Sequence, residues 1–446
     1  MRHRVRTLSF LLAVVFACIS ATTVRADEVT DWNQILFQAA LVAKTSPLII
    51  TRNAAIVQAS VFDAVNGIER RYTPIHVKPG APHGASARAA AVQAAYVSLV
   101  NLYPTQQSTF DSARATSLAA ILDKKRDRDD QQRRQKAVDS GVAWGQEVAD
   151  AIWTWRSTDG FTPVPPPFTG GTNVGEWRPT PPGFAPGAGP QFAYMTPWVI
   201  VTPSQFRPAG PPTLSSARYA EVFNEIKAFG SVSSPLRTAD QTLYSQFWNS
   251  STTSYSWNRI ALYLGAERHM TLLRNALVLA ALNVATADAG IACWDAKYHY
   301  VFWRPVTAIP LADTDGNLAT TADPNWTPLL ITPPHPEYPS GHSTASAAGA
   351  TVLAHYFGKN SSFIVDSDVM FGVVRSFPNF AAALAEINNA RVYGGIHFRT
   401  AVQDGQATGT AVAVYVLKNA FRRVDGHDRD EWEGEDDGLV EHPSSP

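Results

Sequence analysis

Three short segments in the C-terminal half carry residue types that could bind and transform a small anion. The first segment places Lys297 and Arg304 seven residues apart, which is close to two helical turns, and Pro305 follows at once. If a helix continues through Arg304, both cations lie on one face of it, with a break at the proline. Two cations on one side of a largely apolar segment repel each other unless an anion lies between them. The spacing therefore predicts an anion beside this segment.

The second segment begins at His335 and contains the sequence Pro-Ser-Gly-His, which ends at His342. Pro339 and Gly341 shape a tight turn into the alanine-rich helix that follows. The backbone N–H groups of Ser340, Gly341 and His342 would then lie at a helix N-terminus. Free N–H groups at that position bind anions.

The third segment places Arg391 six residues before His397, with Gly394 and Gly395 between them to turn the chain. This spacing lets a guanidinium fork and an imidazole point into one pocket. Together the segments offer one lysine, two arginines, a serine hydroxyl, a glycine amide and two histidines, and no carboxylate among the main contacts. This set fits a tetrahedral oxyanion. Cations and N–H groups would meet its oxygens, one histidine would bond its central atom, and the other would move a proton.

Other site chemistries fit the sequence less well. A zinc site is disfavoured because zinc takes three or four His, Cys or carboxylate ligands without adjacent cations. The sequence has no Gly-x-Ser-x-Gly elbow, no His-Glu-x-x-His helix and no phosphate-binding P-loop. A single Lys or Arg is usually a surface residue, and a single Ser-Gly-His at a helix start is usually a cap. The ordered combination of the three segments therefore carries the prediction.

The order Lys-x6-Arg-Pro, Pro-Ser-Gly-His, Arg-x5-His resembles the superfamily of vanadium-dependent haloperoxidases and type 2 phosphatidic acid phosphatases. The motif region runs from about residue 288 to residue 415. The N-terminal sequence Asp31-Trp32-Asn33, followed by the helix expected over 52–66, also looks like the long bacterial haloperoxidase-like branch. The resemblance implies an all-α fold of two four-helix-bundle-like halves. It also implies a vanadate cofactor, with phosphate able to occupy the same site.

The resemblance assigns a role to each motif residue. His397 would bond vanadium or attack phosphorus, and His342 would be the acid/base catalyst. Lys297 would also polarise the bound peroxide. The oxygens of the oxyanion would be held by Lys297, Arg304, Ser340, Gly341 and Arg391.

Four positions depart from the superfamily pattern or refine it. Ala390 stands where many members have a serine before the third-motif arginine. Ala401 stands where the phosphatases commonly have an aspartate that orients the nucleophilic histidine, so the phosphoryl-transfer role of His397 loses support. Trp294 resembles the pocket tryptophan of fungal chloroperoxidases, whereas His335 resembles the bromoperoxidases. We expect both side chains in the substrate pocket, with bromide preferred over chloride.

The leading hypothesis is a vanadate-dependent haloperoxidase that uses hydrogen peroxide, a halide and a small organic acceptor. The first alternative is an acid phosphatase with His397 as nucleophile and His342 as general acid, because phosphate and vanadate share charge and shape. The second is a non-catalytic oxyanion-binding protein, although simple anion binding does not require His342.

Residues 1–26 have the pattern of a secretory signal peptide, with a basic start, an apolar stretch and small residues before a cleavage site. We therefore expect a secreted or periplasmic protein. Removal of the four arginines of this segment from the 37 Lys and Arg leaves 33 against 38 Asp and Glu, a formal charge of −5. The balance gives no reason to expect a nucleic-acid partner. Cys293 would be the single cysteine left, so no internal disulfide is expected. The sequence leaves the oligomeric state open.

Apolar periodicity predicts helices along most of the chain, and no stretch alternates at period two over a useful length. The longest predicted helix runs from Trp257 to beyond Ala289 and is too polar for a membrane span. The other predicted helices cover 31–44, 52–68, 86–102, 105–122, 131–155, 216–229, 239–248, 341–357, 380–393 and 401–421, the last with a capping box between Thr400 and Gln403.

The predicted domain organisation follows from changes in amino-acid composition and apolar periodicity along the chain. An N-terminal helical region covers 27–230 and includes an excursion over 159–212, which is rich in proline, glycine and aromatic residues. The aromatic content predicts an ordered excursion that either covers a site or pads the surface. A C-terminal helical region covers 231–421 and contains the oxyanion site. An acidic tail, predicted to be mobile, covers 422–446.

Overall fold

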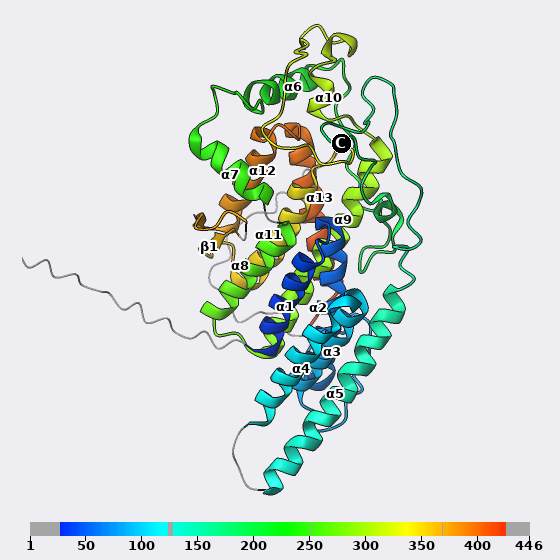
Figure 1. Ribbon diagram of the computed structural model, residues 1–446, viewed down its shortest axis with the longest axis vertical. Helices are drawn as coiled ribbons and strands as arrows, with labels where there is room; N and C mark the ends of the chain where they lie inside the picture. Colours follow the sequence, from blue (N-terminus) through cyan, green and yellow to red (C-terminus); the bar gives the residue numbers. More distant parts are fainter. Residues whose placement is uncertain (1–26, 124–127, 251, 368, 425–446) are drawn as a thin grey trace, which may run out of the picture.

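The computed structural model describes residues 27–123, 128–250, 252–367 and 369–424 (Figure 1). The predicted signal peptide and residues 425–446 of the predicted tail lie outside these residues. The first group of helices consists of α1 (Glu28–Val42), α2 (Pro47–Glu69), α3 (Ala87–Leu102), α4 (Gln107–Leu122) and α5 (Arg128–Arg156). The second consists of α6 (Ala217–Phe229), α7 (Ala239–Ser250), α8 (Thr253–Glu267), α9 (Leu272–Tyr300), α10 (Pro305–Ala308), α11 (Gly341–Phe357), α12 (Phe380–Tyr393) and α13 (Arg399–Asn419).

The fold is all-α within the described residues, apart from one antiparallel hairpin of β1 (Phe363–Asp366) and β2 (Val374–Phe377). Many helices begin at a residue that the sequence marks as a cap. Asp27 and Thr30 form a capping box for α1, and Ser86, Ser216 and Thr271 accept backbone N–H groups at the starts of α3, α6 and α9. Local sequence signals therefore fix where these helices start.

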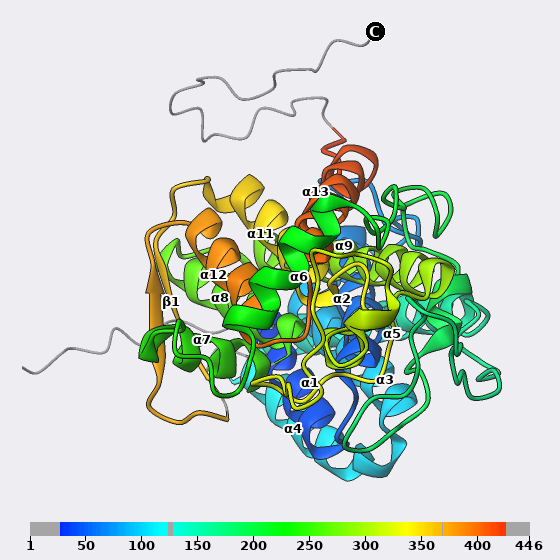
Figure 2. The same cartoon turned by 90° about the horizontal axis from the view of Figure 1, so that it is seen from above.

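Two helical bundles share one core. Helices α2, α3, α4 and α5 pack together in the lower part of Figure 1, with α1 beside them. Helices α8, α9, α11 and α13 pack together in the upper part, and Figure 2 shows α12 beside α11. The bundles meet where α2 packs against α9. Buried apolar side chains of both bundles form one continuous cluster, so the two halves stabilise each other.

Helices α2 and α9 are long and apolar enough to span a membrane by length and composition. However, 89% and 100% of their most apolar windows are buried inside the protein. Both windows are thus packed as core helices of this fold. The predicted long helix beginning at Trp257 is in fact two helices, because the chain turns between Glu267 and Leu272, where His269 adopts a left-handed φ of 49°.

The excursion over 159–212 is ordered and follows the C-terminal half of α9 (teal and green loops on the right of Figure 1). Its regular structure includes the short 3-10 helix Pro190–Tyr194. The buried carboxylate of Asp288 accepts the backbone N–H groups of Trp198, Val199 and Ile200 at 2.7, 2.8 and 3.0 Å. About two turns further along α9, Asp295 pairs with Arg207. These two aspartates hold the excursion against the helix.

Replacement of Asp288 by alanine is expected to lower the free energy of unfolding by about 3 kcal/mol or more. It removes the acceptor of three N–H groups, and each buried donor left without a partner costs about 1–3 kcal/mol. Urea unfolding measures the change. The matched control is Arg207→Ala, which breaks a partly exposed ion pair and is expected to cost under about 1 kcal/mol. Equal losses in the two variants would show that Asp288 does not anchor the excursion.

Two further expectations about the elements are wrong. Helix α13 begins at Arg399 after Phe398, and no side chain caps it, because Gln403 instead accepts a hydrogen bond from Arg218. The hairpin of β1 and β2 was not predicted, since each strand has only four residues and β2 buries only Phe377 fully.

Candidate functional site: a buried cluster of cations and histidines

The first motif reaches the site by a different path from the one predicted. Lys297 lies in the last turn of α9, but that helix ends at Tyr300 because Val301 turns the chain with a left-handed φ of 48°. Arg304 therefore does not lie on the same helix as Lys297 and is instead the N-cap residue of α10. The two cations meet across this turn rather than along one helical face. The β-branched Val301 gives no sequence signal for such a turn.

Lys297 holds the loop of the second motif. Its fully buried ammonium donates to the carbonyl oxygens of Pro336, Glu337 and Pro339 at 2.8, 3.0 and 2.5 Å. All three N–H groups of the ammonium are thus engaged with backbone. A ligand that takes a hydrogen bond from Lys297 must replace one of these carbonyls.

Arg304 joins the second motif to the third. Its Nε donates to the His335 carbonyl at 2.9 Å, and its Nη1 donates to the Ile396 carbonyl at 2.7 Å. The same Nη1 lies 3.2 Å from His397 Nε2, and Nη2 lies 2.9 Å from His335 Nδ1. The guanidinium is fully buried, so its contacts with the two imidazoles are shielded from water.

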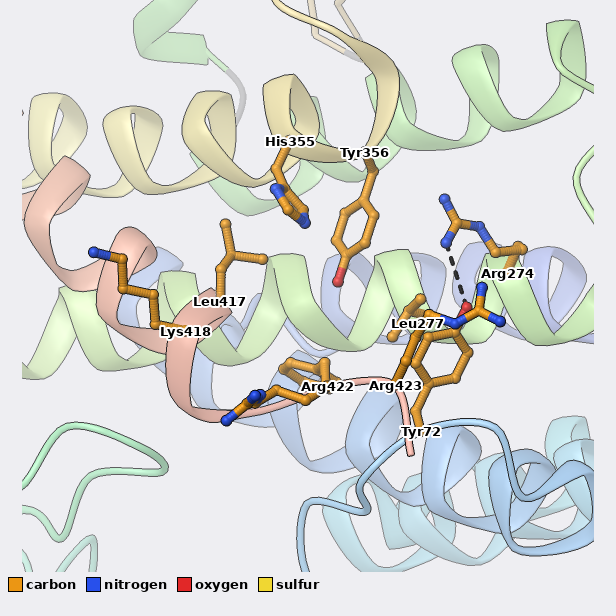
Figure 3. A pocket seen from close by; sticks show the side chains of 10 residues that line it. Tyr72, Arg274, Leu277, His355, Tyr356, Leu417, Lys418, Arg422 and Arg423 are labelled. Atoms are coloured by element: carbon orange, nitrogen blue, oxygen red, sulfur yellow. Dashed lines mark hydrogen bonds between the residues drawn. The ribbon is translucent and has the colours of Figure 1, made fainter. Parts of the chain in front are cut away.

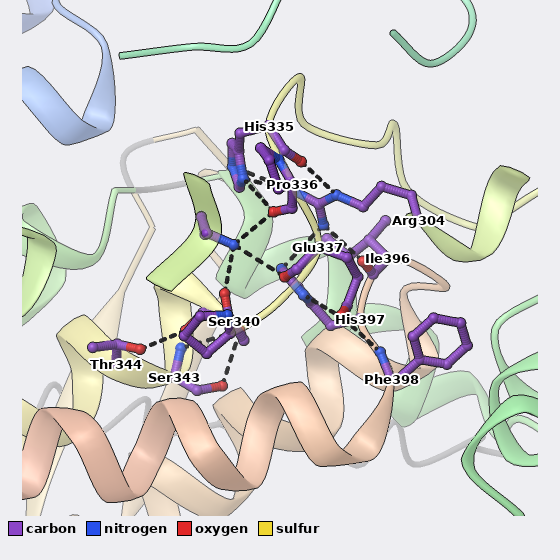
Figure 4. A network of polar contacts seen from close by, with 12 residues as sticks. Arg304, His335, Pro336, Glu337, Ser340, Ser343, Thr344, Ile396, His397 and Phe398 are labelled. Carbon is purple, nitrogen blue, oxygen red and sulfur yellow. Dashed lines mark hydrogen bonds and ion pairs between the residues drawn. The ribbon is translucent and has the colours of Figure 1, made fainter. Parts of the chain in front are cut away.

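Glu337 is a site residue that the sequence analysis missed. Its Oε1 lies 3.0 Å from His397 Nδ1 and accepts the backbone N–H of Phe398 at 2.9 Å (Figure 4). No carboxylate was expected among the main contacts of the oxyanion, and Glu337 contacts His397 Nδ1 rather than the groups expected to face the oxyanion. The partner that Ala401 does not give His397 comes instead from the second motif. A carboxylate between two prolines in a motif otherwise suited to anions was the available signal.

Arg391 lies at the end of α12 and is fully buried. Its Nη2 donates to Asn249 Oδ1 at 3.1 Å, whereas its Nε and Nη1 have no partner among the residues that the structure describes. A buried guanidinium with unsatisfied N–H groups and no carboxylate beside it requires an external acceptor. This is the feature of the site that most directly fits an oxyanion.

Ser340 is the N-cap of α11, and its hydroxyl lies 3.1 Å from the hydroxyl of Ser343. Its backbone N–H donates to the Ala401 carbonyl, so that amide is already engaged. A Cβ on Gly341 would lie 3.2 Å from the Trp294 ring, which shows how closely the ring covers the helix start. A Cβ on Gly409 would lie 2.0 Å from the Thr344 carbonyl oxygen, so glycine lets α13 approach the first turns of α11.

His335, Gly341 and His342 form the partly exposed side of the cluster, whereas the three cations are fully buried. The Trp294 and His335 rings lie 5.0 Å apart, and Trp294 Nε1 donates to the Ala188 carbonyl of the excursion. The excursion therefore borders this side of the site. The third motif contributes His397, which is 2% exposed and lies behind the partly exposed residues.

The cations of the cluster are buried and lie close together, and this shifts the pKa values of its titratable groups. Burial, with further repulsion from Arg304, lowers the pKa of Lys297 to about 7 and that of Arg391 to about 9. Burial lowers the pKa of Arg304 to about 10. The cluster contains three histidines, His335, His342 and His397. Burial and the neighbouring cations hold the pKa of each well below its usual range. An anion among these groups would reverse each of these shifts.

The residues fit a tetrahedral oxyanion better than a bare metal ion. Among the described residues no group of three or more His, Cys, Asp or Glu is arranged to hold a metal. Glu337 is bonded to His397 on the side away from Nε2, so it does not neutralise Arg391. The donors on offer are buried cations, a hydroxyl and a helix start, which are donors to oxygen atoms.

Several neighbouring residues do not join the cluster. His299 is exposed and stacks edge-on against Tyr300. Asp288 and Asp295 anchor the excursion, as described above. A separate basic pocket of about 420 Å³ includes Arg274 and Lys418 in its lining (Figure 3). Arg274 is in the first turn of α9 and Lys297 is in the last, about 35 Å away at 1.5 Å per residue.

Comparisons with known proteins relate the chain to vanadium haloperoxidases. The family model of the VCPO second helical-bundle domain matches residues 277–426, which include all three motifs. Over 92 residues the chain is 33% identical to vanadium chloroperoxidase of Curvularia inaequalis. The aligned segment covers 18% of this chain and 14% of the fungal enzyme.

Solved structures extend the likeness to most of the chain. The structure described as the first bacterial vanadium-dependent iodoperoxidase superposes with a TM-score of 0.76 at 26% identity, and covers 88% of this chain and 96% of its own. The apo and holo forms of a bacterial vanadium-dependent chloroperoxidase superpose with a TM-score of 0.64. Their identities are 19% and 20%, with 84% and 90% of this chain covered, and this likeness shows the shared fold.

This chain combines two helical bundles with a buried cluster of cations and histidines. The family match over residues 277–426 and the fold likeness to the bacterial iodoperoxidase both support the superfamily of vanadium-dependent haloperoxidases.

Proposed function

We propose that the protein is an exported vanadate-dependent haloperoxidase that oxidises a halide with hydrogen peroxide and passes the halogen to a small organic acceptor. The observation that carries the proposal is Arg391, whose Nε and Nη1 are buried without a partner among the described residues, close enough to Arg304 for the two charges to repel. The pattern of residues 1–26 supports export. The haloperoxidases among the similar proteins support the reaction class.

The proposed cofactor contacts come from all three motifs. Arg391 and Arg304 would neutralise the charge of the oxyanion, the Ser340 hydroxyl and the start of α11 would donate to its oxygens, and His397 would offer Nε2 to its central atom. When bound, vanadate would supply a Lewis acid that activates the peroxide without changing its own redox state.

His342 and Lys297 are the groups proposed to act on the peroxide. Neutral His342 lies on the partly exposed side and would accept the proton of a peroxide oxygen and later return it to the leaving oxygen. Lys297 would exchange one of its carbonyl contacts for a peroxide oxygen and draw electron density from it. The halide would approach past Trp294 and His335. We expect bromide to be used in preference to chloride, and iodide, the easiest of the three to oxidise, to be used as well.

A phosphatase is the second candidate, and Glu337 favours it. The carboxylate supplies the partner for His397 that a nucleophilic histidine needs and that Ala401 does not provide. Phosphate fits the same donors as vanadate, so His397 would attack phosphorus and His342 would protonate the leaving alkoxide.

The two candidates differ in two assays of the purified full chain. With added vanadate and hydrogen peroxide, we expect bromide-dependent halogenation of a colorimetric acceptor and retention of about one vanadium per chain. Without peroxide, we expect at most slow hydrolysis of an aryl phosphate. Rapid hydrolysis that vanadate suppresses, without bromination, would instead establish the phosphatase. Retention of the oxyanion with neither activity would leave a binding protein.

A further inference from the structure

The carboxylate of Glu337 lies directly behind the histidine that is proposed to bond the oxyanion. The side chain is fully buried, and its Oε1 is shared between His397 Nδ1 at 3.0 Å and the Phe398 N–H at 2.9 Å. The backbone of the same residue is held at both ends. Its N–H donates to the Phe302 carbonyl at 2.9 Å, and its carbonyl accepts from Lys297 at 3.0 Å. Glu337 therefore contacts all the segments that bring His397 and Lys297 together.

The two contacts of the His397 ring determine which nitrogen carries the proton. A guanidinium has donors only, so Arg304 Nη1, 3.2 Å from Nε2, requires Nε2 to act as the acceptor. A neutral ring whose Nε2 is an acceptor carries its proton on Nδ1, and Glu337 Oε1, which also accepts the Phe398 N–H, is the acceptor placed to receive it. Both contacts are satisfied by one neutral tautomer, with the proton on Nδ1 and a lone pair on Nε2.

We propose that Glu337 is a positioning residue that fixes this tautomer and ring orientation of His397 before any oxyanion binds. Its consequence for binding rests on the proposed function, since Nε2 then faces the oxyanion with its lone pair available. The fixed tautomer itself is a property of the chain alone.

The origin of the carboxylate makes the assignment specific to this chain. In the phosphatases that this chain resembles, an aspartate at the position of Ala401, at the start of α13, commonly serves as the partner of the histidine. Here Ala401 is fully buried, and its carbonyl accepts the N–H of Ser340. Glu337 supplies the carboxylate from the loop that precedes Ser340, so the second motif orients the histidine of the third.

The primary test is the protonation pattern of His397 in the full chain without oxyanion, read from long-range nitrogen–proton NMR spectra of ¹⁵N-histidine-labelled protein. The His397 signals are assigned by their absence from His397→Ala. We expect a protonated Nδ1 and an unprotonated Nε2. A wild-type spectrum with the proton on Nε2 would overturn the proposal, whatever the activity.

Variants of Glu337 connect the tautomer to binding, with orthovanadate as the probe in calorimetry. Glu337→Leu is expected to lose the preference for Nδ1–H and about 10–100-fold in vanadate affinity, the usual effect of removing the group behind a metal-ligating histidine. Glu337→Gln keeps an acceptor oxygen at the same length, so it is expected to keep the tautomer and to rescue most of the affinity. An unchanged tautomer and affinity in Glu337→Leu would contradict the role.

Asp404→Asn is the matched control, because this carboxylate accepts the hydroxyl of Tyr338, the residue next to Glu337, and does not contact His397. We expect it to leave both readouts unchanged. If Glu337→Leu does not fold, the wild-type spectrum and Glu337→Gln decide the outcome, and loss of the tautomer in the glutamine variant would contradict the hydrogen-bond argument. If the wild type shows the expected tautomer but binds neither phosphate nor vanadate, the proposed function fails while the positioning role stands.

Discussion

Replacement of His397 by alanine is expected to abolish vanadate retention, with a loss of affinity greater than about 100-fold. Changes to groups behind a ligating histidine already cost about 10–100-fold, and removal of the histidine itself should cost more. The cations cannot compensate, since Arg304 and Lys297 keep their existing partners in the variant. Metal content after vanadate loading and gel filtration measures the loss, and halogenation should fall with it.

His299→Ala is the matched control for this experiment. His299 is an exposed imidazole two residues after Lys297 on α9, outside the cluster. We expect it to retain vanadate and activity at the wild-type level. Equal vanadium content in wild type and His397→Ala would refute the assignment of His397.

Replacement of His342 by alanine is expected to slow turnover by about 10²–10⁴-fold, the range in which a positioned general acid or base contributes. Vanadate retention should stay close to that of wild type, because His342 lies on the partly exposed side, whereas the groups proposed to hold the oxyanion are the buried cations and His397. Steady-state halogenation and metal content measured on the same sample separate the two effects. A variant that loses vanadium in proportion to activity would make His342 an oxyanion-binding residue instead.

The contrast between the two variants also carries information. A cluster that only bound an anion would give the two histidines similar effects, both on retention. Loss of retention in one variant and loss of turnover in the other requires a catalytic site.

The helices were predictable because their signals are local. Apolar spacing located most of them to within a few residues, and capping residues fixed several starts. The failures have nonlocal causes. The turn at His269 and the end of α9 at Val301 both use left-handed backbone in residues other than glycine, which tertiary packing imposes and composition does not reveal.

The motifs of the site could be predicted, but their connections could not. Spacing identified Lys297 and Arg304, yet the helix that was expected to align them ends between them. Glu337 was overlooked because its partner His397 is sixty residues away in the sequence, and only the folded chain shows which histidine a buried carboxylate contacts. Arg391 shows the same limitation, because its unpartnered N–H groups are visible only after the burial of α12 is known.

The contact of Trp294 with the excursion has a consequence for how such a protein can evolve. The Ala188 carbonyl holds both the Trp294 indole and the Tyr298 hydroxyl, whereas the excursion supplies none of the groups proposed to hold the oxyanion. Substitutions or length changes in this irregular segment would alter the approach to the partly exposed side while the chemistry behind it stays intact. We therefore expect changes in this segment to alter access to the site independently of the residues proposed to carry out the reaction.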